Sequence, residues 1–223
     1  MWVTKIKLLD KECIWATRCK QFDIYDYQYP LGFYKTKKGL ALMLYHILDG
    51  EEKNIKRYTF AVKKDKRIEK IEVRKNFMIS LAVEKRTKKE LRAFEALYNE
   101  KLIYVKPGIN YPDGTEIWEI ASFEREDLAK SIDFIGKYYS GELLFLKEIK
   151  APKIFIPEIM PELTDKQYNA FKTASQQGYY EFPRKTNLHK LAKISGISRP
   201  TLEEHLRKAE IKLLRFMKEL ILK

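Results

Sequence analysis

The chain has few cysteines, few glycines and no long run of apolar residues. Its 223 residues include two cysteines, Cys13 and Cys19, and nine glycines. Two thiols without nearby histidines cannot build a disulfide framework or a structural zinc site. We therefore expect a protein of a reducing, cytoplasmic compartment that holds no metal and no cofactor.

Long hydrophobic segments are also missing. The longest apolar run covers about residues 40–48 and is interrupted by a tyrosine and a histidine. A membrane-spanning helix needs about 20 apolar residues. The first residues, MWVTKIKLLDKE, carry no signal-peptide pattern. We therefore expect a soluble protein with no membrane partner.

Motifs of several enzyme classes do not occur in the sequence. There is no glycine-rich phosphate loop, no HExxH motif and no nucleophile elbow. The carboxylates are scattered among lysines, as on solvated surfaces. We therefore expect a protein that is not an enzyme.

Acidic residues are fewer than basic ones. The chain has 44 Lys+Arg against 31 Asp+Glu, a formal net charge of +13. Residues 151–223 carry 14 basic and 8 acidic residues, a net +6 over 73 residues, against +7 over the first 150. This balance favours an anionic partner such as nucleic acid and points to the C-terminal part, although many thermophilic proteins are similarly rich in lysine and glutamate.

Proline is concentrated in one segment, EIKAPKIFIPEIMPELT. Proline at this density blocks both helix and central strand. We expect a proline-rich linker over residues 151–162. It separates an α+β sensor or dimerisation domain, residues 1–150, from a helix-turn-helix DNA-binding domain, residues 163–223.

The first 150 residues show mixed strand and helix patterns. Capping-box spacing at Thr87 and Glu90 favours the start of one helix, and Gly141 favours the end of another. Helices are predicted over residues 37–50, 86–100 and 124–141. Strands are predicted over residues 2–9, 56–64, 67–75, 76–85, 101–108, 115–123 and 142–149.

The order of these elements indicates a fold. From Phe77 to Ile149 it reads β-α-β-β-α-β, the order of a ferredoxin-like unit. The first 75 residues allow a degenerate second copy. We therefore predict a ferredoxin-like α+β domain, with duplication as an open alternative, followed by an all-α domain.

Three features of this region have both a functional and a structural interpretation. Tyr25, Tyr27 and Tyr29 share one face of a strand, which suits a ligand pocket or dimer surface but more commonly reflects core packing. Cys13 and Cys19 form a redox switch if they meet in space, but two small buried residues are the commoner case. A histidine at position 46 lies in the predicted helix 37–50 without an evident partner.

Helix signals run through the C-terminal part. Helices are predicted over residues 165–177, over 188–195 and from 199 almost to 223. The candidate N-caps are Thr164, then Thr186 or Asn187, then Ser198, and the helix-ending glycines are Gly178 and Gly196.

The last two helices have the parts of a helix-turn-helix. Ala192 is small enough for the helices to approach closely, and Gly196 can adopt the positive φ of the bend. Ile197, Leu202 and Leu206 are expected to seal the angle between the helices. An ordinary helical hairpin is the alternative, and the agreement of cap, bend, seal and basic exterior argues against it.

Outward-facing residues at the start of the last helix are the candidate DNA contacts, because the N-terminal residues of a recognition helix meet the base edges. Ser198 can hold a phosphate with the free backbone N–H groups, and Arg199 can reach guanine or phosphate. Pro200 and the methyl group of Thr201 suit a thymine methyl. The remaining candidates are Lys193, Glu204, His205 and Lys208.

Three stretches of the C-terminal part match one known family together: LTDKQ, GYYEFPRK and GISRPTLEEHLRKAE. They make residues 163–214 resemble the C-terminal helix-turn-helix domain of archaeal regulators of the bacterio-opsin activator type and, more distantly, the DNA-binding end of bacterial sigma factors. The resemblance implies a transcription regulator with a ligand-sensing or protein-binding N-terminal module. It implies recognition positions at Ser198, Arg199, Thr201, Glu204 and His205, with Arg184 and Lys185 toward the DNA backbone.

The resemblance does not extend to the segment in front of Ala151. The segment in front of that residue is too short for both sensor domains of the namesake. Light sensing, oxygen sensing and control of opsin therefore do not carry over.

These observations predict a sequence-specific regulator that binds double-stranded DNA. The alternative is an interaction protein that docks transcription machinery or a partner helix without reading DNA. An apolar stripe continues beyond the helix-turn-helix, which predicts a symmetric homodimer, although packing within the chain would also use it. The candidate dimer contacts are Leu213, Phe216, Met217 and Leu220. A small-molecule effector in the N-terminal domain is left open.

Overall fold

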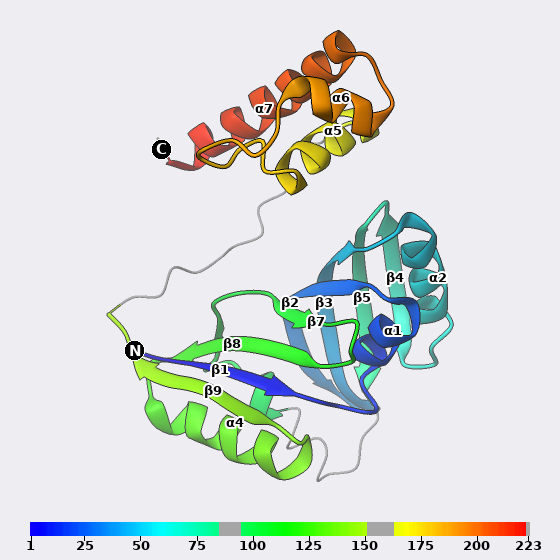
Figure 1. Cartoon of the computed structure of the whole chain (residues 1–223). Coiled ribbons are helices and arrows are strands. Elements are labelled where there is room, and N and C mark those ends of the chain that lie inside the picture. Colours follow the sequence, from blue (N-terminus) through cyan, green and yellow to red (C-terminus); the bar gives the residue numbers. More distant parts are fainter. Residues whose placement is uncertain (85–94, 151–162, 222–223) are drawn as a thin grey trace. The chain divides into compact units, whose positions relative to one another are not determined.

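The computed structural model of the protein describes residues 1–84, 95–150 and 163–221 (Figure 1). Contacts divide the chain into two compact units, Met1–Ile156 and Pro157–Lys223. This division falls inside the segment 151–162 that we predicted as a linker, and that segment lies outside the described residues. No helix in the described parts of the chain is both long and apolar enough to cross a bilayer.

The first unit is built from an antiparallel sheet with helices. Its described helices are α1 (Ile14–Phe22), α2 (Glu52–Lys63) and α4 (Arg125–Tyr138). Its strands are β1 (Trp2–Leu8), β2 (Tyr25–Thr36), β3 (Gly39–Asp49), β4 (Ile68–Arg74), β5 (Phe77–Glu84), β6 (Ile103–Tyr104), β7 (Gly108–Asn110), β8 (Glu116–Ser122) and β9 (Glu142–Glu148).

Sheet order shows the same arrangement at both ends. The strands lie in the order β4-β5-β3-β2-β7-β8-β1-β9, and β6 pairs with β8. Strands β3 and β4 both run antiparallel to β5, which lies between them, and α2 connects them. In the same way β8 and β9 flank β1, and α4 connects them. Each end is therefore a split βαβ unit.

A ferredoxin-like unit over residues 77–149 would place the strand that begins at Phe77 between the two strands that α4 connects. The structure places a different strand there, so this part of the prediction is wrong. Strand β5 pairs with β3 and β4, while the place beside β8 and β9 is taken by β1, from the start of the chain. All these strands are apolar on one face, so their local patterns do not specify the partner. The helix predicted over residues 86–100 lies largely outside the described residues.

Two predicted elements have the opposite type of secondary structure. The segment 37–50 was predicted as a helix but forms β3, and the segment 56–64 was predicted as a strand but forms the end of α2 and its C-cap residue. In β3 the buried leucines 40, 42, 44 and 48 recur at even positions, which also includes the four-residue spacing of a helix. In α2 the buried Tyr58 and Val62 lie four residues apart, as one helical face requires.

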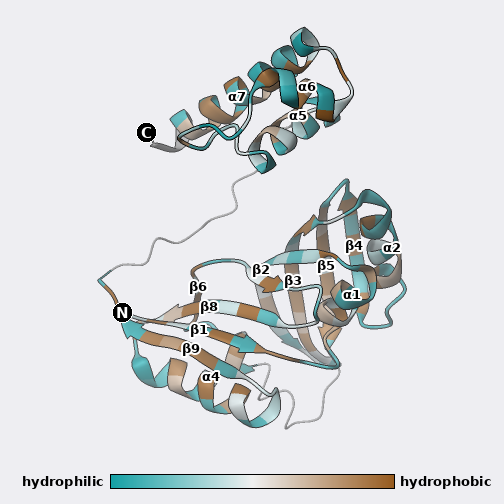
Figure 2. Cartoon of the chain, in the orientation of Figure 1, coloured by the Kyte–Doolittle hydropathy of each residue, from teal (hydrophilic) through white to brown (hydrophobic). Residues whose placement is uncertain are grey.

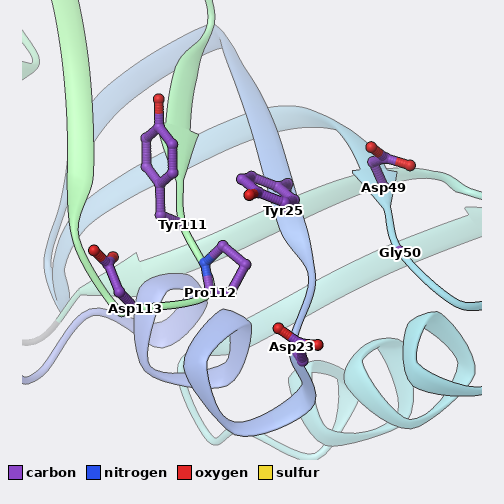
Figure 3. Close-up of a pocket in the computed structure, with 7 residues that line it drawn as sticks. All are labelled: Asp23, Tyr25, Asp49, Gly50, Tyr111, Pro112 and Asp113. Atoms are coloured by element: carbon purple, nitrogen blue, oxygen red, sulfur yellow. The ribbon is translucent and has the colours of Figure 1, made fainter. Parts of the chain in front are cut away.

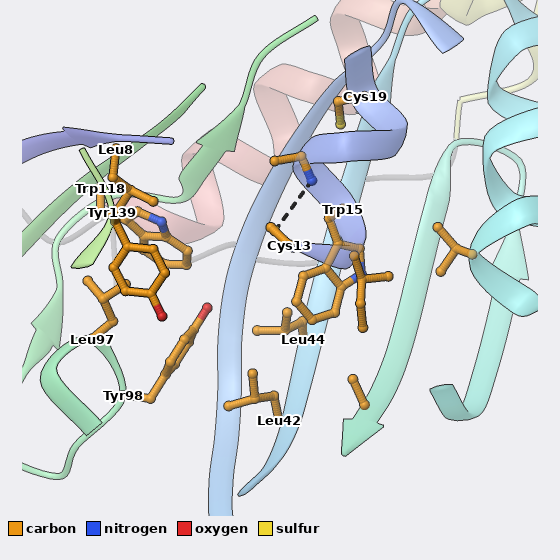
Figure 4. Packing of buried hydrophobic residues seen from close by; sticks show 14 of the residues in the cluster. Leu8, Cys13, Trp15, Cys19, Leu42, Leu44, Leu97, Tyr98, Trp118 and Tyr139 are labelled. Carbon is orange, nitrogen blue, oxygen red and sulfur yellow. Dashed lines mark hydrogen bonds between the residues drawn. The ribbon is translucent and has the colours of Figure 1, made fainter. Parts of the chain in front are cut away.

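The main hydrophobic core lies between one face of the sheet and the helices. Leu42 and Leu44 of β3 contribute to it together with Trp15 of α1 and Trp118 of β8 (Figure 4). Gly108 is required next to Trp118, because a Cβ atom on Gly108 would lie 2.6 Å from the indole ring. Strand β7 joins the two ends of the sheet, because it pairs with β2 on one side and with β8 on the other.

The described residues of the second unit form three helices, as predicted: α5 (Asp165–Gln176), α6 (Leu188–Ser195) and α7 (Arg199–Ile221). They enclose a small core of their own. Its buried members are Ala170, Ala174, Leu191, Ala192, Leu202 and Leu206.

Candidate nucleic-acid interface

Side-chain caps define the helices of the second unit where the sequence placed them. Thr164 and Gln167 form a capping box at the start of α5. Of the two candidates before α6, Asn187 is the cap, since its side chain accepts from the backbone N–H of Lys190. Gly196 ends α6 with a left-handed φ of 64°. These local signals set the geometry of the turn between α6 and α7.

The angle between α6 and α7 is sealed by a short apolar contact. Ala192 of α6 and both Leu202 and Leu206 of α7 are buried, as predicted. Leu191 adds to this contact. Ile197 does not, because it is exposed, so its predicted role in the seal is wrong. It sits in the turn after Gly196, where the chain passes outside the small core.

The first turn of α7 is capped and solvent-exposed. The backbone N–H of Thr201 donates to Ser198 Oγ at 3.3 Å, and the two hydroxyl oxygens lie 2.7 Å apart. Arg199, Pro200 and Thr201 are all exposed. The turn therefore presents one cation, one rigid ring and one methyl group at a helix N-terminus, which is the part of a recognition helix that meets base edges.

One turn further along α7, an acid and a base are already paired. Lys208 Nζ donates to Glu204 Oε1 at 2.5 Å on the exposed surface. The hydrogen bond and the charge of Lys208 lower the pKa of Glu204. His205, between them in sequence, is half-buried. Of these three candidates, Glu204 and Lys208 therefore form an ion pair without net charge. In this state neither side chain presents an independent charge to a DNA phosphate.

The connection between α5 and α6 places its basic residues on aromatic and acidic neighbours. The guanidinium of Arg184 lies 4.5 Å from the centroid of the Tyr179 ring, a cation–π contact. Lys185 Nζ lies 2.6 Å from Glu181 Oε2. Both side chains are exposed. The connection also folds back on itself, because the backbone N–H of Lys185 donates to the carbonyl of Gly178.

This connection is tied to α7 by a contact that the sequence analysis did not identify. Tyr180 donates a hydrogen bond of 2.7 Å from its hydroxyl to Glu210 Oε1. Burial, together with this hydrogen bond, raises the pKa of Tyr180. No local pattern joins residues 30 positions apart, so only the folded chain reveals the tether. It fixes the position of Arg184 and Lys185 relative to the helix.

The surface of α6 contributes further cations. Lys193, a predicted phosphate contact, is exposed. Lys190 is also exposed and follows the cap residue Asn187 in the first turn of α6. We add Lys190 to the candidates, because a cation at that position could meet a phosphate held at the helix N-terminus.

The predicted dimer stripe on α7 is half-covered where it is described. Leu213 and Phe216 are partly buried, and Met217 is exposed. Leu220 belongs to α7, but its side chain lies outside the described part of the chain. The exposed Leu214 lies beside this stripe.

In the first unit, His46 was expected in a helix, without an evident partner. It lies instead on strand β3 and belongs to a buried cluster of hydrogen-bonded polar side chains. Its Nδ1 lies 3.0 Å from both carboxylate oxygens of Asp26, and its Nε2 lies 2.8 Å from Ser80 Oγ. Tyr58 and Gln28 also donate to Asp26. An acid, a histidine and a serine in this order resemble a hydrolase triad. All three side chains are completely buried, so a substrate cannot reach the serine.

Cys13 and Cys19 are both buried and free. The interpretation as two small buried residues is therefore confirmed. Burial raises the pKa of both thiols, which disfavours the reactive thiolate form. Within the described residues, no group of three metal-ligating side chains comes together.

A shallow pocket of about 400 Å³ lies where the two ends of the sheet meet (Figure 3). Tyr25 and Tyr111 line it and meet edge-on, with ring centroids 5.6 Å apart. Asp23, Asp49 and Asp113 surround these rings. The pocket is acidic and aromatic in a chain that is basic overall.

Comparison with known proteins supports the C-terminal assignment. A family described as a helix-turn-helix DNA-binding domain matches residues 163–215. A Haloferax volcanii protein named as a transcriptional regulator is 38% identical over 68 residues, which are 30% of this chain and 12% of that protein. The transcriptional regulator NarO of the same organism is 43% identical over 53 residues, 24% of this chain and 25% of NarO.

The family match covers residues 163–215 of this chain, and each match to a relative covers only a small share of that relative. Residues 163–215 are a helix-turn-helix DNA-binding domain of the bacterio-opsin activator type, as the sequence predicted. The chain spans an eighth to a quarter of the length of these relatives. These relatives therefore do not show what the whole protein does, and its function has to be inferred from its own residues.

Proposed function

We propose that the protein is a sequence-specific DNA-binding regulator of transcription that acts as a cytoplasmic homodimer. The observation that carries this proposal is the matched helix-turn-helix domain, in which the capped first turn of α7 presents Arg199, Pro200 and Thr201 to solvent. Two relatives named as transcriptional regulators support the same function.

In this proposal the exposed residues have two kinds of role. Arg199 and Thr201 read base edges in the major groove, since they lie at the N-terminus of the recognition helix. Lys190, Lys193 and Arg184 neutralise phosphates on either side. Ser198 holds the first turn of α7 in place and offers its backbone neighbours to a phosphate.

Selection of bound sites from a random pool of double-stranded DNA by the purified full chain tests this function. The expected result is an enriched motif that binds at least about 1,000-fold more tightly than a scrambled duplex. The logarithm of the affinity should fall linearly with the logarithm of the salt concentration. Absence of an enriched motif, with affinity independent of salt, would contradict DNA reading.

A second candidate function is docking to transcription machinery without base readout. One observation favours it: Phe182, in the connection tied to α7, is fully exposed. A protein contact through this ring would show weak dependence on salt and no preference among DNA sequences. The site-selection experiment therefore separates the two functions.

For the N-terminal unit we propose protein interaction or ligand sensing on a duplicated scaffold. Its two split βαβ ends support two copies of a ferredoxin-like βαββαβ unit that have exchanged their first strands, β1 and β5. The pocket between Tyr25 and Tyr111 is the candidate place for a small-molecule effector. An effector bound there should raise the unfolding temperature of the chain, and Tyr111→Ala should remove that shift.

A further inference from the structure

One face of the sheet in the first unit is apolar although the described helices lie on the other face. Along β3, Leu42, Leu44 and His46 point to α1 and α2 and are fully buried. Met43 and Tyr45 point the opposite way, and 38% of Met43 is exposed. An antiparallel sheet with one solvated face normally carries polar side chains there.

Register places these outward residues in uncharged rows across the sheet. One row runs Tyr27, Ile47 and Phe77, and the next runs Tyr29, Tyr45 and Ile79. Ring contacts run along and between the rows: the ring centroid of Tyr45 lies 6.2 Å from that of Tyr29 in its own row and 6.1 Å from that of Phe77 in the other row. We call this surface the open face and define it by six residues: Tyr27, Met43, Tyr45, Ile47, Phe77 and Ile79. Strands β3 and β5 are coloured mainly hydrophobic in Figure 2.

The open face has the exposure of a contact surface that lacks its partner. Ile79 is 44% exposed, and Tyr27, Tyr45, Ile47 and Phe77 are partly exposed. With strands about 4.8 Å apart and same-face residues about 6.8 Å apart along a strand, the six residues of the open face cover roughly 200 Å² of the sheet. That is about a quarter of the roughly 800 Å² that one partner contributes to an interface of standard size, so the open face would form the apolar centre and the surrounding residues would contribute the rest.

Charges surround the open face but do not enter it. None of its six residues is ionisable near neutral pH, in a chain with 34% charged residues. On β4 the register partners of Ile79 and Phe77 are Glu72 and Arg74. At the other border Asp49 pairs with Tyr25. An apolar centre with a rim of both signs is the usual composition of a protein–protein interface.

We propose that the open face is the contact through which two copies of this chain associate. Two copies that each carry a net charge of +13 repel one another, so they associate only where the burial of apolar area outweighs this repulsion and no like charges meet in the contact. The open face is an apolar surface without charged residues, which meets both conditions. Two sheets pack face to face about 10 Å apart, and the same patch can meet itself across a two-fold axis. A rim that contains Glu72, Asp49 and Arg74 can then pair opposite signs between copies.

This inference rests on the proposed function in one respect. A two-fold dimer supplies two helix-turn-helix units, and two half-sites about 34 Å apart give such regulators their specificity. The contact itself is measured without DNA, so its failure is distinguishable from a failure of DNA binding.

Sedimentation of the full chain tests the proposal. The wild type, of 26.6 kDa per chain, should sediment as a dimer at micromolar concentration. Met43→Lys/Ile79→Lys adds two charges to the open face at positions that are already exposed. It should raise the dimer dissociation constant at least about 100-fold, while circular dichroism and tryptophan fluorescence stay unchanged.

Two control variants make the result specific. Phe60→Lys/Leu144→Lys adds the same charge at exposed apolar positions on α2 and β9 and should leave the dimer intact. Leu214→Glu/Met217→Glu changes exposed positions on α7 and should also leave it intact. The Met43→Lys/Ile79→Lys variant should still bind a DNA half-site with the affinity and salt dependence of one wild-type protomer.

Three outcomes would overturn the proposal. A monomeric wild type at 100 µM would mean that the open face is covered by another part of this chain or by a different protein. A folded Met43→Lys/Ile79→Lys variant that stays dimeric would move the contact elsewhere. Dissociation by Leu214→Glu/Met217→Glu alone would place it on α7. If the Met43→Lys/Ile79→Lys variant is unfolded, the exposed Ile79→Lys single variant is compared in the same way.

Discussion

Asp26 and His46 lie 3.0 Å apart in the interior of the first unit, and neither side chain is exposed to solvent. The carboxylate receives further hydrogen bonds from Tyr58 and Gln28. These hydrogen bonds compensate the buried carboxylate for the water that it has lost. Removing them would leave polar groups buried without a partner, which costs about 1–3 kcal/mol for a neutral group and more for a charged one.

Asp26→Ala should therefore destabilise the first unit by about 3–5 kcal/mol, since it leaves His46 and Tyr58 without their acceptor. Ser80→Ala removes one partner of His46 and should cost about 1–2 kcal/mol. Urea denaturation followed by tryptophan fluorescence measures both, because Trp2, Trp15 and Trp118 all belong to the first unit. A loss below 1 kcal/mol for Asp26→Ala would show that the cluster is not needed for stability.

Asp65 should contribute stability that depends on pH. Burial alone would raise its pKa, but hydrogen bonds from Arg67 and the nearby charge of Arg18 lower it well below the ordinary value. A carboxyl with a lowered folded-state pKa stabilises the protein above its unfolded pKa of about 3.9, and this contribution is lost as the pH falls below it.

Asp65→Asn should then cost about 1–2 kcal/mol at pH 7, a figure already reduced for partial solvent exposure. The difference from the wild type should shrink between pH 4 and pH 2. Tryptophan-detected denaturation at several pH values measures it, with the exposed Asp133→Asn as the control. A difference independent of pH would contradict an ionic role for Asp65.

Arg199→Ala should weaken binding to the selected DNA site by about 1–3 kcal/mol and relax the base preference at one position. The reason is that Arg199 lies in the exposed first turn of α7. Fluorescence anisotropy on the selected site and its single-base variants measures the effect. Lys193→Ala is the comparison: it should weaken binding to all sequences alike and flatten the salt dependence. An equal loss on every sequence would remove Arg199 from base readout.

Glu204→Gln should strengthen binding to all DNA sequences by a similar factor. The substitution removes a negative charge from the surface that we propose to face DNA, and it releases Lys208 from its ion pair. The slope of affinity against salt should become steeper by about one unit. Glu181→Gln, which releases Lys185 in the same way, is a matched comparison. A loss of preference for one base would instead mean that Glu204 accepts a hydrogen bond from cytosine.

Much of the second unit could be predicted from the sequence. The cap Thr164, the bend at Gly196 and the buried faces of Leu202 and Leu206 all agree with the structure, and of the two caps left open before α6 the structure uses Asn187. Each of these depends on hydrogen bonds or spacing within a few residues, so the local sequence contains the information. The base contacts stay predictions, since no DNA-bound geometry constrains them.

Tertiary structure decided the features that depend on contacts between residues far apart in the sequence. Leucines at 40, 44 and 48 fit a helix as well as a strand, and the pairing of β3 with β2 and β5 made the segment a strand. The place of β1 between β8 and β9, the acceptor for His46 and the tether from Tyr180 to Glu210 each join residues at least 20 positions apart. In the second unit, the sequence by itself determined where the helices begin, end and bury their apolar faces, because those choices are local. Strand partners and buried polar pairs were decided only by the fold, because many apolar strands are locally equivalent and only the assembled core selects among them.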